Sequence, residues 1–129
     1  MVAQTRTRTP DMRLKVYQYA KCSTCRKALN WLRTQGVDFA TVDIVTTPPS
    51  KQELKDVLEK SGLPIKKLFN TSGQSYRDGG FGARLPEMSD AQALSALAED
   101  GKLIKRPLVI GKDFALVGFD EKAYRARLG

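Results

Sequence analysis

The two cysteines of the chain lie three residues apart, in the stretch "KCSTCRKAL". A structural disulfide between such near neighbours would close a very short loop and stabilise little. A metal site would need further ligands, and the 129 residues include no histidine and no third cysteine, so we expect no metal. Two inert buried thiols remain an alternative. A C-x-x-C between a strand and a helix is typical of redox-active thiols, so we favour a reactive thiol here.

A helix is predicted directly after the pair, because apolar residues recur there at helical spacing. They are Ala28, Leu29, Trp31 and Leu32. This spacing places Cys22 in the preceding loop and Cys25 in the first helical turn. Backbone N–H groups at a helix start have no intrahelical partner and carry partial positive charge, which favours a thiolate. We therefore predict that Cys22 is the nucleophile, with a lowered pKa, and that Cys25 can close a disulfide with it.

Polar side chains next to the predicted nucleophile are candidates for substrate binding. Lys21 and Arg26 add full positive charge near the thiol. Ser23 and Thr24 are small, and their hydroxyl groups can donate to a thiolate or to a bound anion. We expect these four residues to line the substrate site.

The remaining sequence predicts an alternation of strands and helices. A strand at 14–19, the helix after the cysteines and a strand at 39–45 form a β-α-β unit with parallel strands. Capping signals place further helices, from Ser50 with Glu53 to Gly62 and from Ser89 with Gln92 to Gly101. The other expected elements are a short helix at 63–70, a loop with at most a helical turn at 71–88, a β-hairpin at 106–119 and a helix at 120–128.

This order predicts the fold class α/β, with a thioredoxin-like core and a helical insertion. The core would be a small mixed sheet with one parallel and one antiparallel pair of strands. We expect a single domain at 14–129, with the insertion at about 50–100 and a flexible basic arm at 1–13.

Composition limits the possible partners. The formal net charge is +8, which suits an anionic partner such as a carboxylate-bearing thiol, an oxyanion or an acidic protein. No nucleic-acid-binding motif accompanies that charge, so direct binding to nucleic acid is not expected. No apolar run reaches the roughly 20 residues that span a bilayer, and the first residues hold no apolar core of a secretory signal. We expect a cytoplasmic protein with no membrane contact.

The stretch "LIKRPLVI" supplies a second candidate region. A proline at the start of a buried strand has a specific role, since it cannot donate to the sheet. In thioredoxin-like folds a proline at this place, often cis, faces the active cysteine. Pro107 would then bound the site. Arg106 would bring a guanidinium group near Cys22, where it could hold an oxyanion or carboxylate.

Five stretches together resemble the arsenate-reductase-like group of thioredoxin-fold proteins, which includes ArsC, Spx and YffB. They are "YQYAKCSTCRKALNWL", "TPPSKQEL", "LFNTSG", "LIKRPLVI" and "LVGFDEKAY", and the resemblance runs from about residue 14 to residue 128. It implies a thioredoxin-like core with a helical insertion and a catalytic cysteine at Cys22.

The resemblance also implies which functions are candidates for this chain. The arsenate reductases of this group use one cysteine and three arginines; Cys22 and Arg106 match, whereas the other two positions hold Asn70 and Ala93. Asn70 remains a candidate for substrate binding. We therefore expect a thiol-disulfide oxidoreductase that uses glutathione or thioredoxin as co-substrate and holds no bound cofactor, with arsenate a less favoured substrate. The alternative is an Spx-like redox-sensing regulator that binds RNA polymerase through the C-terminal domain of its α-subunit.

Overall fold

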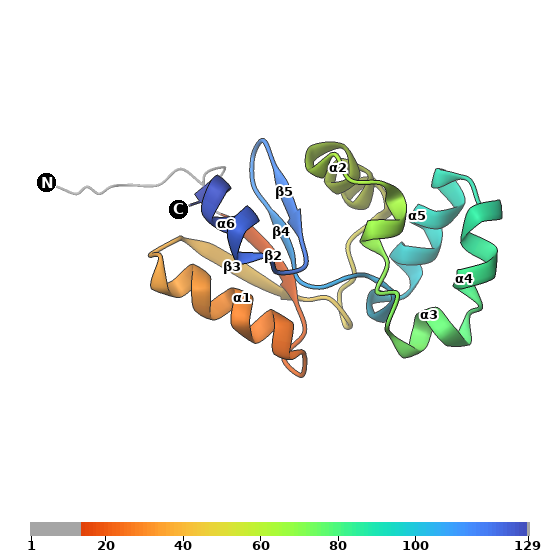
Figure 1. Cartoon of the computed structure of the whole chain (residues 1–129), viewed down its shortest axis with the longest axis horizontal. Coiled ribbons are helices and arrows are strands. Elements are labelled where there is room, and N and C mark those ends of the chain that lie inside the picture. The colour runs from red at the N-terminus through yellow and green to blue at the C-terminus, as the bar shows by residue number, and fades with distance from the viewer. Residues whose placement is uncertain (1–13, 129) are drawn as a thin grey trace, which may run out of the picture.

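The computed structural model describes residues 14–128 and shows a four-stranded mixed sheet with helices on both faces (Figure 1). In order across the sheet, the strands are β3 (Phe39–Asp43), β2 (Leu14–Gln18), β4 (Leu108–Ile110) and β5 (Ala115–Val117). β2 is parallel to β3, and β4 is antiparallel to both β2 and β5. The predicted mixed sheet is confirmed. The arm expected at 1–13 lies outside the described residues.

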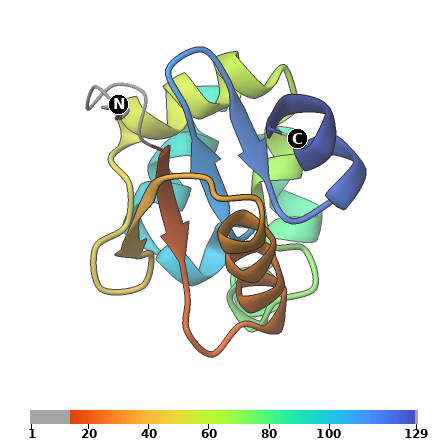
Figure 2. The same ribbon diagram turned by 90° about the vertical axis from the view of Figure 1, so that its left-hand side faces the viewer.

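Alternation along the strands sends side chains to two separate cores, one on each face of the sheet. The smaller core lies under α1 (Ser23–Thr34) and α6 (Glu121–Leu128), which cover one face (Figure 2). It is formed by Leu14, Val16, Ala28, Leu29, Leu32, Val109 and Tyr124. On the opposite face, Tyr17 and Leu108 join the larger core, which continues into the helical insertion.

The C-terminal end of α1 is closed by two backbone hydrogen bonds. The N–H of Gly36 donates to the carbonyl of Arg33 at 3.0 Å, and that of Val37 donates to Leu32 at 3.1 Å. Gly36 has a φ of +70°, which glycine adopts at little cost. These paired bonds define the C-terminal end of α1.

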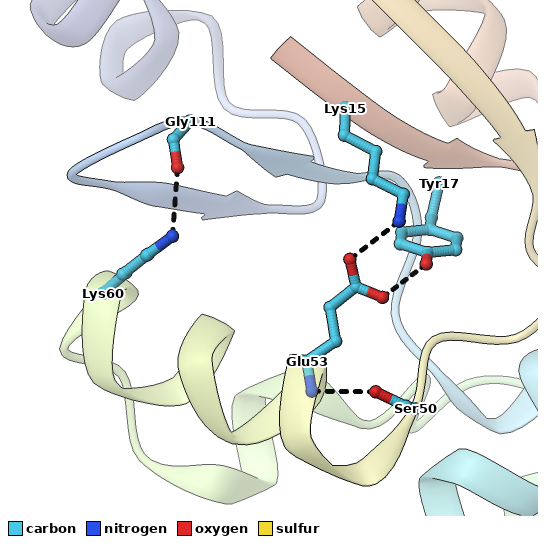
Figure 3. Close-up of polar contacts among 6 residues, drawn as sticks. All are labelled: Lys15, Tyr17, Ser50, Glu53, Lys60 and Gly111. Carbon is cyan, nitrogen blue, oxygen red and sulfur yellow. Dashed lines mark hydrogen bonds and ion pairs between the residues drawn. The ribbon is translucent and has the colours of Figure 1, made fainter. Parts of the chain in front are cut away.

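α2 (Lys51–Ser61) is held against the sheet by polar contacts at its N-terminal end (Figure 3). Ser50 Oγ accepts from the backbone N–H of Glu53 at 3.1 Å, as the sequence predicts. The Glu53 carboxylate, however, accepts from Lys15 Nζ at 2.9 Å and from the Tyr17 hydroxyl at 2.5 Å. The expected capping box is therefore only half formed, because Glu53 is drawn to two donors on β2.

The C-terminal end of α2 has its own contact with the sheet. Gly62 ends the helix, as predicted, and its N–H donates to the carbonyl of Leu58 at 3.2 Å. Lys60 Nζ reaches across to the carbonyl of Gly111 in the β4–β5 turn at 3.1 Å (Figure 3). α2 is thus fixed at both ends.

The insertion is more helical than the sequence predicts. The sequence predicts a loop with at most a helical turn at 71–88, yet these residues contain α3 (Gln74–Asp78), α4 (Phe81–Arg84) and a 3-10 turn at Leu85–Glu87. These helices are too short to show a period. They are held by an aromatic cluster of Phe69, Tyr76 and Phe81, whose ring centroids lie 5.6–6.3 Å apart. α5 (Asp90–Glu99) begins with the predicted Ser89–Gln92 capping box.

The insertion returns to the sheet through a short antiparallel pairing. The N–H of Lys105 donates to the carbonyl of Leu68, and the N–H of Asn70 donates to that of Leu103, both at 2.8 Å. A single bridge joins Phe69 to Ile104. This pairing fixes the chain immediately before Arg106.

Candidate active site

Cys22 lies at the N-cap of α1, in the loop that leaves β2. Its N–H donates to the carbonyl of Tyr19 at 3.0 Å, and its own carbonyl accepts from the N–H of Arg26 at 3.1 Å. The side chain is half-buried and its thiol is free. A reagent can therefore reach the sulfur while the backbone around it is held on both sides.

Cys25 lies one turn further along α1 and is fully buried. Its Sγ accepts from the backbone N–H of Tyr19 at 3.4 Å. The helical spacing contained the signal for this burial, because Cys25 falls on the same face of α1 as Ala28, Leu29 and Leu32. The two cysteines thus differ in exposure, since Cys22 is half-buried and Cys25 is fully buried.

The environment of Cys22 lowers its pKa. Partial burial alone would raise the pKa, but it is outweighed by the backbone N–H and the thiol of Cys25, and by the hydrogen bonding and charge of Arg106. Of the nearby cations, Arg106 is the one that acts on the thiol. The sequence predicts positive charge near the thiol from Lys21 and Arg26 as well as from Arg106, and Arg106 is the one of these three among the causes of the shift.

The environment of Cys25 acts in the opposite direction. Burial, and then the hydrogen bond and charge of Cys22, raise the pKa of Cys25 to about 12, although the Tyr19 N–H and Arg106 partly oppose them. The two pKa values therefore move apart, so that Cys22 loses its proton before Cys25 and the Cys25 S–H can then donate to the Cys22 thiolate. This difference in pKa favours Cys22 as the attacking sulfur and keeps Cys25 as a protonated second thiol.

Arg106 reaches the site from the start of β4. The Arg106–Pro107 peptide bond is cis, and Pro107 is buried. Arg106 Nη1 donates to the carbonyl of Lys102 at 3.3 Å, and its guanidinium carbon lies 5.3 Å from the centroid of the Tyr19 ring. Tyr19 was not among the site residues predicted from the sequence. Its signal was modest: an aromatic residue three positions before the cysteine, at the end of a strand.

The other predicted site residues near Cys22 are exposed. Lys21, Ser23 and Thr24 are exposed in the loop and in the first turn of α1, on either side of Cys22. Arg26 is also exposed, but its Nη1 donates to the carbonyl of Ala20 at 2.8 Å. It lines a shallow hollow along α1, together with Gln18, Lys27, Asn30 and Arg33.

Asn70, Arg77 and Arg84 form hydrogen bonds within the insertion. The Asn70 side chain accepts from the Ser72 hydroxyl at 3.5 Å. Arg77 donates to the carbonyl of Ser72 at 2.7 Å, and Arg84 donates to that of Gly79 at 2.8 Å. The structure brings Cys22, Cys25 and Arg106 together, and the hydrogen bonds of Asn70, Arg77 and Arg84 described here are to other residues of the insertion.

Residues 14–128 hold neither a metal-binding cluster nor a membrane-spanning helix. Over this range, no group of three or more histidine, cysteine, aspartate or glutamate side chains could hold a metal ion. No helix in the same range is long and apolar enough to cross a membrane.

Comparison with known proteins places this geometry in a family. The sequence profile of the ArsC family matches residues 17–127. YusI of Bacillus subtilis (strain 168) is 48% identical over 113 residues, which cover 88% of this chain and 96% of YusI. The crystal structure of an ArsC-family-related protein from Bacteroides fragilis superposes with a TM-score of 0.86 at 40% identity, covering 90% of this chain and 98% of that one.

More distant relatives carry two kinds of name. An arsenate reductase of Rhizobium meliloti (strain 1021) is 30% identical over 99 residues, covering 77% of this chain and 69% of the relative. A global transcriptional regulator Spx of Streptococcus agalactiae (strain 2603 V/R) is 28% identical over 107 residues, covering 83% and 77%. Together with the mixed sheet and the cysteine pair at the start of α1, these similarities show that the chain belongs to the ArsC family.

Proposed function

We propose that this protein is a thiol-disulfide oxidoreductase whose nucleophile is Cys22. The observation that carries the proposal is the half-exposed Cys22 thiol between Cys25 and Arg106, with a lowered pKa. Thiolate is the reactive form of cysteine, so a lowered pKa increases the reactive fraction at neutral pH. We further propose that the protein acts in the cytoplasm, where thiol reductants are available.

In the first step, the Cys22 thiolate attacks one sulfur of a substrate disulfide. A new S–S bond forms between Cys22 and that sulfur, the substrate S–S bond breaks, and the second substrate sulfur leaves as a thiolate that takes a proton from solvent. Arg106 supports this step by stabilising the Cys22 thiolate and by offering N–H donors to a carboxylate of the substrate. Lys21, Ser23 and Thr24 lie where they can contact the same group.

Two routes can then regenerate Cys22. The thiolate of glutathione can attack the mixed disulfide, or Cys25 can attack Cys22 and release the substrate as a thiol. In the second route, a dithiol such as that of thioredoxin reduces the Cys22–Cys25 disulfide. Formation of the mixed disulfide removes the negative charge of Cys22, which is one cause of the raised pKa of Cys25. Burial remains, so we expect resolution by Cys25 to be slower than attack by Cys22.

A disulfide with an anionic group is a better candidate substrate than arsenate. Two of the three arginine positions of the related arsenate reductases hold Asn70 and Ala93 in this chain, and Ala93 is 1% exposed in the core. Arg77 and Arg84 donate to backbone carbonyls of the insertion. One guanidinium next to Cys22 suits a carboxylate, whereas a fully charged oxyanion needs more donors.

A second candidate is a redox-sensing regulator, which is supported by the similarity to Spx. In this alternative, the Cys22–Cys25 disulfide would be a sensor, and the partner would be RNA polymerase, bound through the C-terminal domain of its α-subunit. The paired thiols are compatible with both functions, since each requires a thiolate at Cys22. The two differ in whether the protein turns over.

The test is turnover of a glutathione mixed disulfide by the reduced protein, with glutathione or a thioredoxin system as reductant. Cys22→Ser should abolish turnover with either reductant. Cys25→Ser should retain glutathione-coupled turnover and lose turnover that depends on thioredoxin. A wild-type protein that shows no turnover, yet binds the polymerase domain in one redox state alone, would replace the enzyme with the regulator.

A further inference from the structure

Tyr19 contacts each of the three residues that define the site. Its carbonyl accepts from the N–H of Cys22, and its N–H donates to the sulfur of Cys25. Its ring lies under the guanidinium group of Arg106, at 5.3 Å from the centroid. The first two contacts use the backbone, so they persist whatever side chain occupies this position. The third depends on the aromatic ring.

The ring of Tyr19 is held in place by packing. It is half-buried and packs against the larger core, so its position is set by that packing. The Arg106 guanidinium also donates to the carbonyl of Lys102 at 3.3 Å, which is long for a hydrogen bond. An unsupported arginine side chain has many accessible rotamers, and stacking over an aromatic face limits them.

We propose that Tyr19 is a positioning residue, whose ring holds the Arg106 guanidinium against Cys22 by a cation–π contact. Tyr19 acts through Arg106, which must lie beside the thiol for its charge to be felt there. This inference rests on the proposed role of Cys22, but its test measures only the reactivity of the Cys22 thiol and needs no enzymatic turnover.

The experiment is the pH profile of alkylation of Cys22 by iodoacetamide in four variants of the full chain. Tyr19→Leu keeps apolar bulk and removes the ring, and it should alkylate roughly threefold more slowly than the wild type at pH values below the thiol pKa. Tyr19→Phe keeps the ring and should stay within about 1.5-fold of the wild type. If Tyr19→Leu does not fold, Tyr19→Met takes its place.

The other two variants test whether Tyr19 acts through Arg106. In the Arg106→Ala background, adding Tyr19→Leu should cause no further slowing, because the cation is already absent. Equal slowing in both backgrounds would overturn the inference, as would a Tyr19→Leu profile that matches the wild type. A wild-type Cys22 with an ordinary pKa is a different result, and it would refute the proposed function itself.

Discussion

Replacing Arg106 by alanine tests how much of the reactivity of Cys22 comes from one guanidinium group. Arg106 acts on the thiolate through both hydrogen bonding and charge. A hydrogen bond to a charged group contributes about 1.5–3 kcal/mol when shielded from water. Cys22 is half-buried, so solvent reduces this contribution, and we take about 1 kcal/mol. This corresponds to roughly a fivefold smaller thiolate fraction below the pKa.

The sign follows from the charge. A cation favours the thiolate and lowers the pKa of Cys22, so its removal must raise that pKa and move the alkylation profile to higher pH. With neutral iodoacetamide, Arg106→Ala should therefore react about fivefold more slowly at pH values below the pKa. At pH values well above it, where the thiol is fully ionised in both proteins, the two rates should converge.

Iodoacetate, the anionic counterpart of iodoacetamide, separates the two roles of Arg106. If Arg106 also holds the anionic part of a substrate, Arg106→Ala should remain slower with iodoacetate even at high pH. Arg26→Ala is the matched control, because it removes the same charge from the same end of the molecule, while its guanidinium binds the carbonyl of Ala20. Equal effects of the two substitutions would mean that net charge, and not the position of Arg106, sets the reactivity.

Three further predictions concern the second thiol and the fold. Iodoacetamide should modify the native protein once, at Cys22, and the denatured protein twice, because Cys25 is fully buried and its pKa is raised to about 12. Peptide mass mapping that finds both cysteines modified in the native protein would contradict this. Glu53→Gln weakens the contacts between α2 and β2 and should cost about 1 kcal/mol in urea unfolding, without changing the alkylation rate; an unchanged midpoint would show that these contacts add nothing. Gly101→Ala should lower the free energy of unfolding by about 2 kcal/mol or more, since the new Cβ would overlap the backbone carbonyl of Ile44. Gly82→Ala is the control: its Cβ has room, so the loss should be less than about 1 kcal/mol. Similar melting temperatures for the two variants would refute the close packing at Gly101.

Much of the core could be predicted from the sequence because its signals are local. The helix after the cysteines follows from apolar spacing, and α5 follows from the Ser89–Gln92 capping box. The β4–β5 hairpin follows from a short polar turn between two apolar stretches. Each of these features depends on residues that are close in the chain, so no knowledge of the tertiary structure was needed.

The insertion and the support of Arg106 depend on contacts between distant residues. α3 and α4 are stabilised by packing of Phe69, Tyr76 and Phe81, and this packing cannot be predicted from helical periodicity in the sequence. The stacking of Arg106 on Tyr19 joins two residues that lie 87 positions apart in the sequence. The half-formed capping box has the same origin, because the sequence cannot show that β2 offers Glu53 two better partners.

The most direct test of the central claim is the intact mass of the reduced protein after brief treatment with oxidised glutathione. If Cys22 is the activated thiolate, the protein should gain one glutathionyl group that maps to Cys22, or lose two hydrogens as Cys25 displaces that group. Cys22→Ser should show neither change. A wild-type protein that stays unmodified, or an adduct that maps to Cys25, would contradict the assignment of Cys22 as the nucleophile.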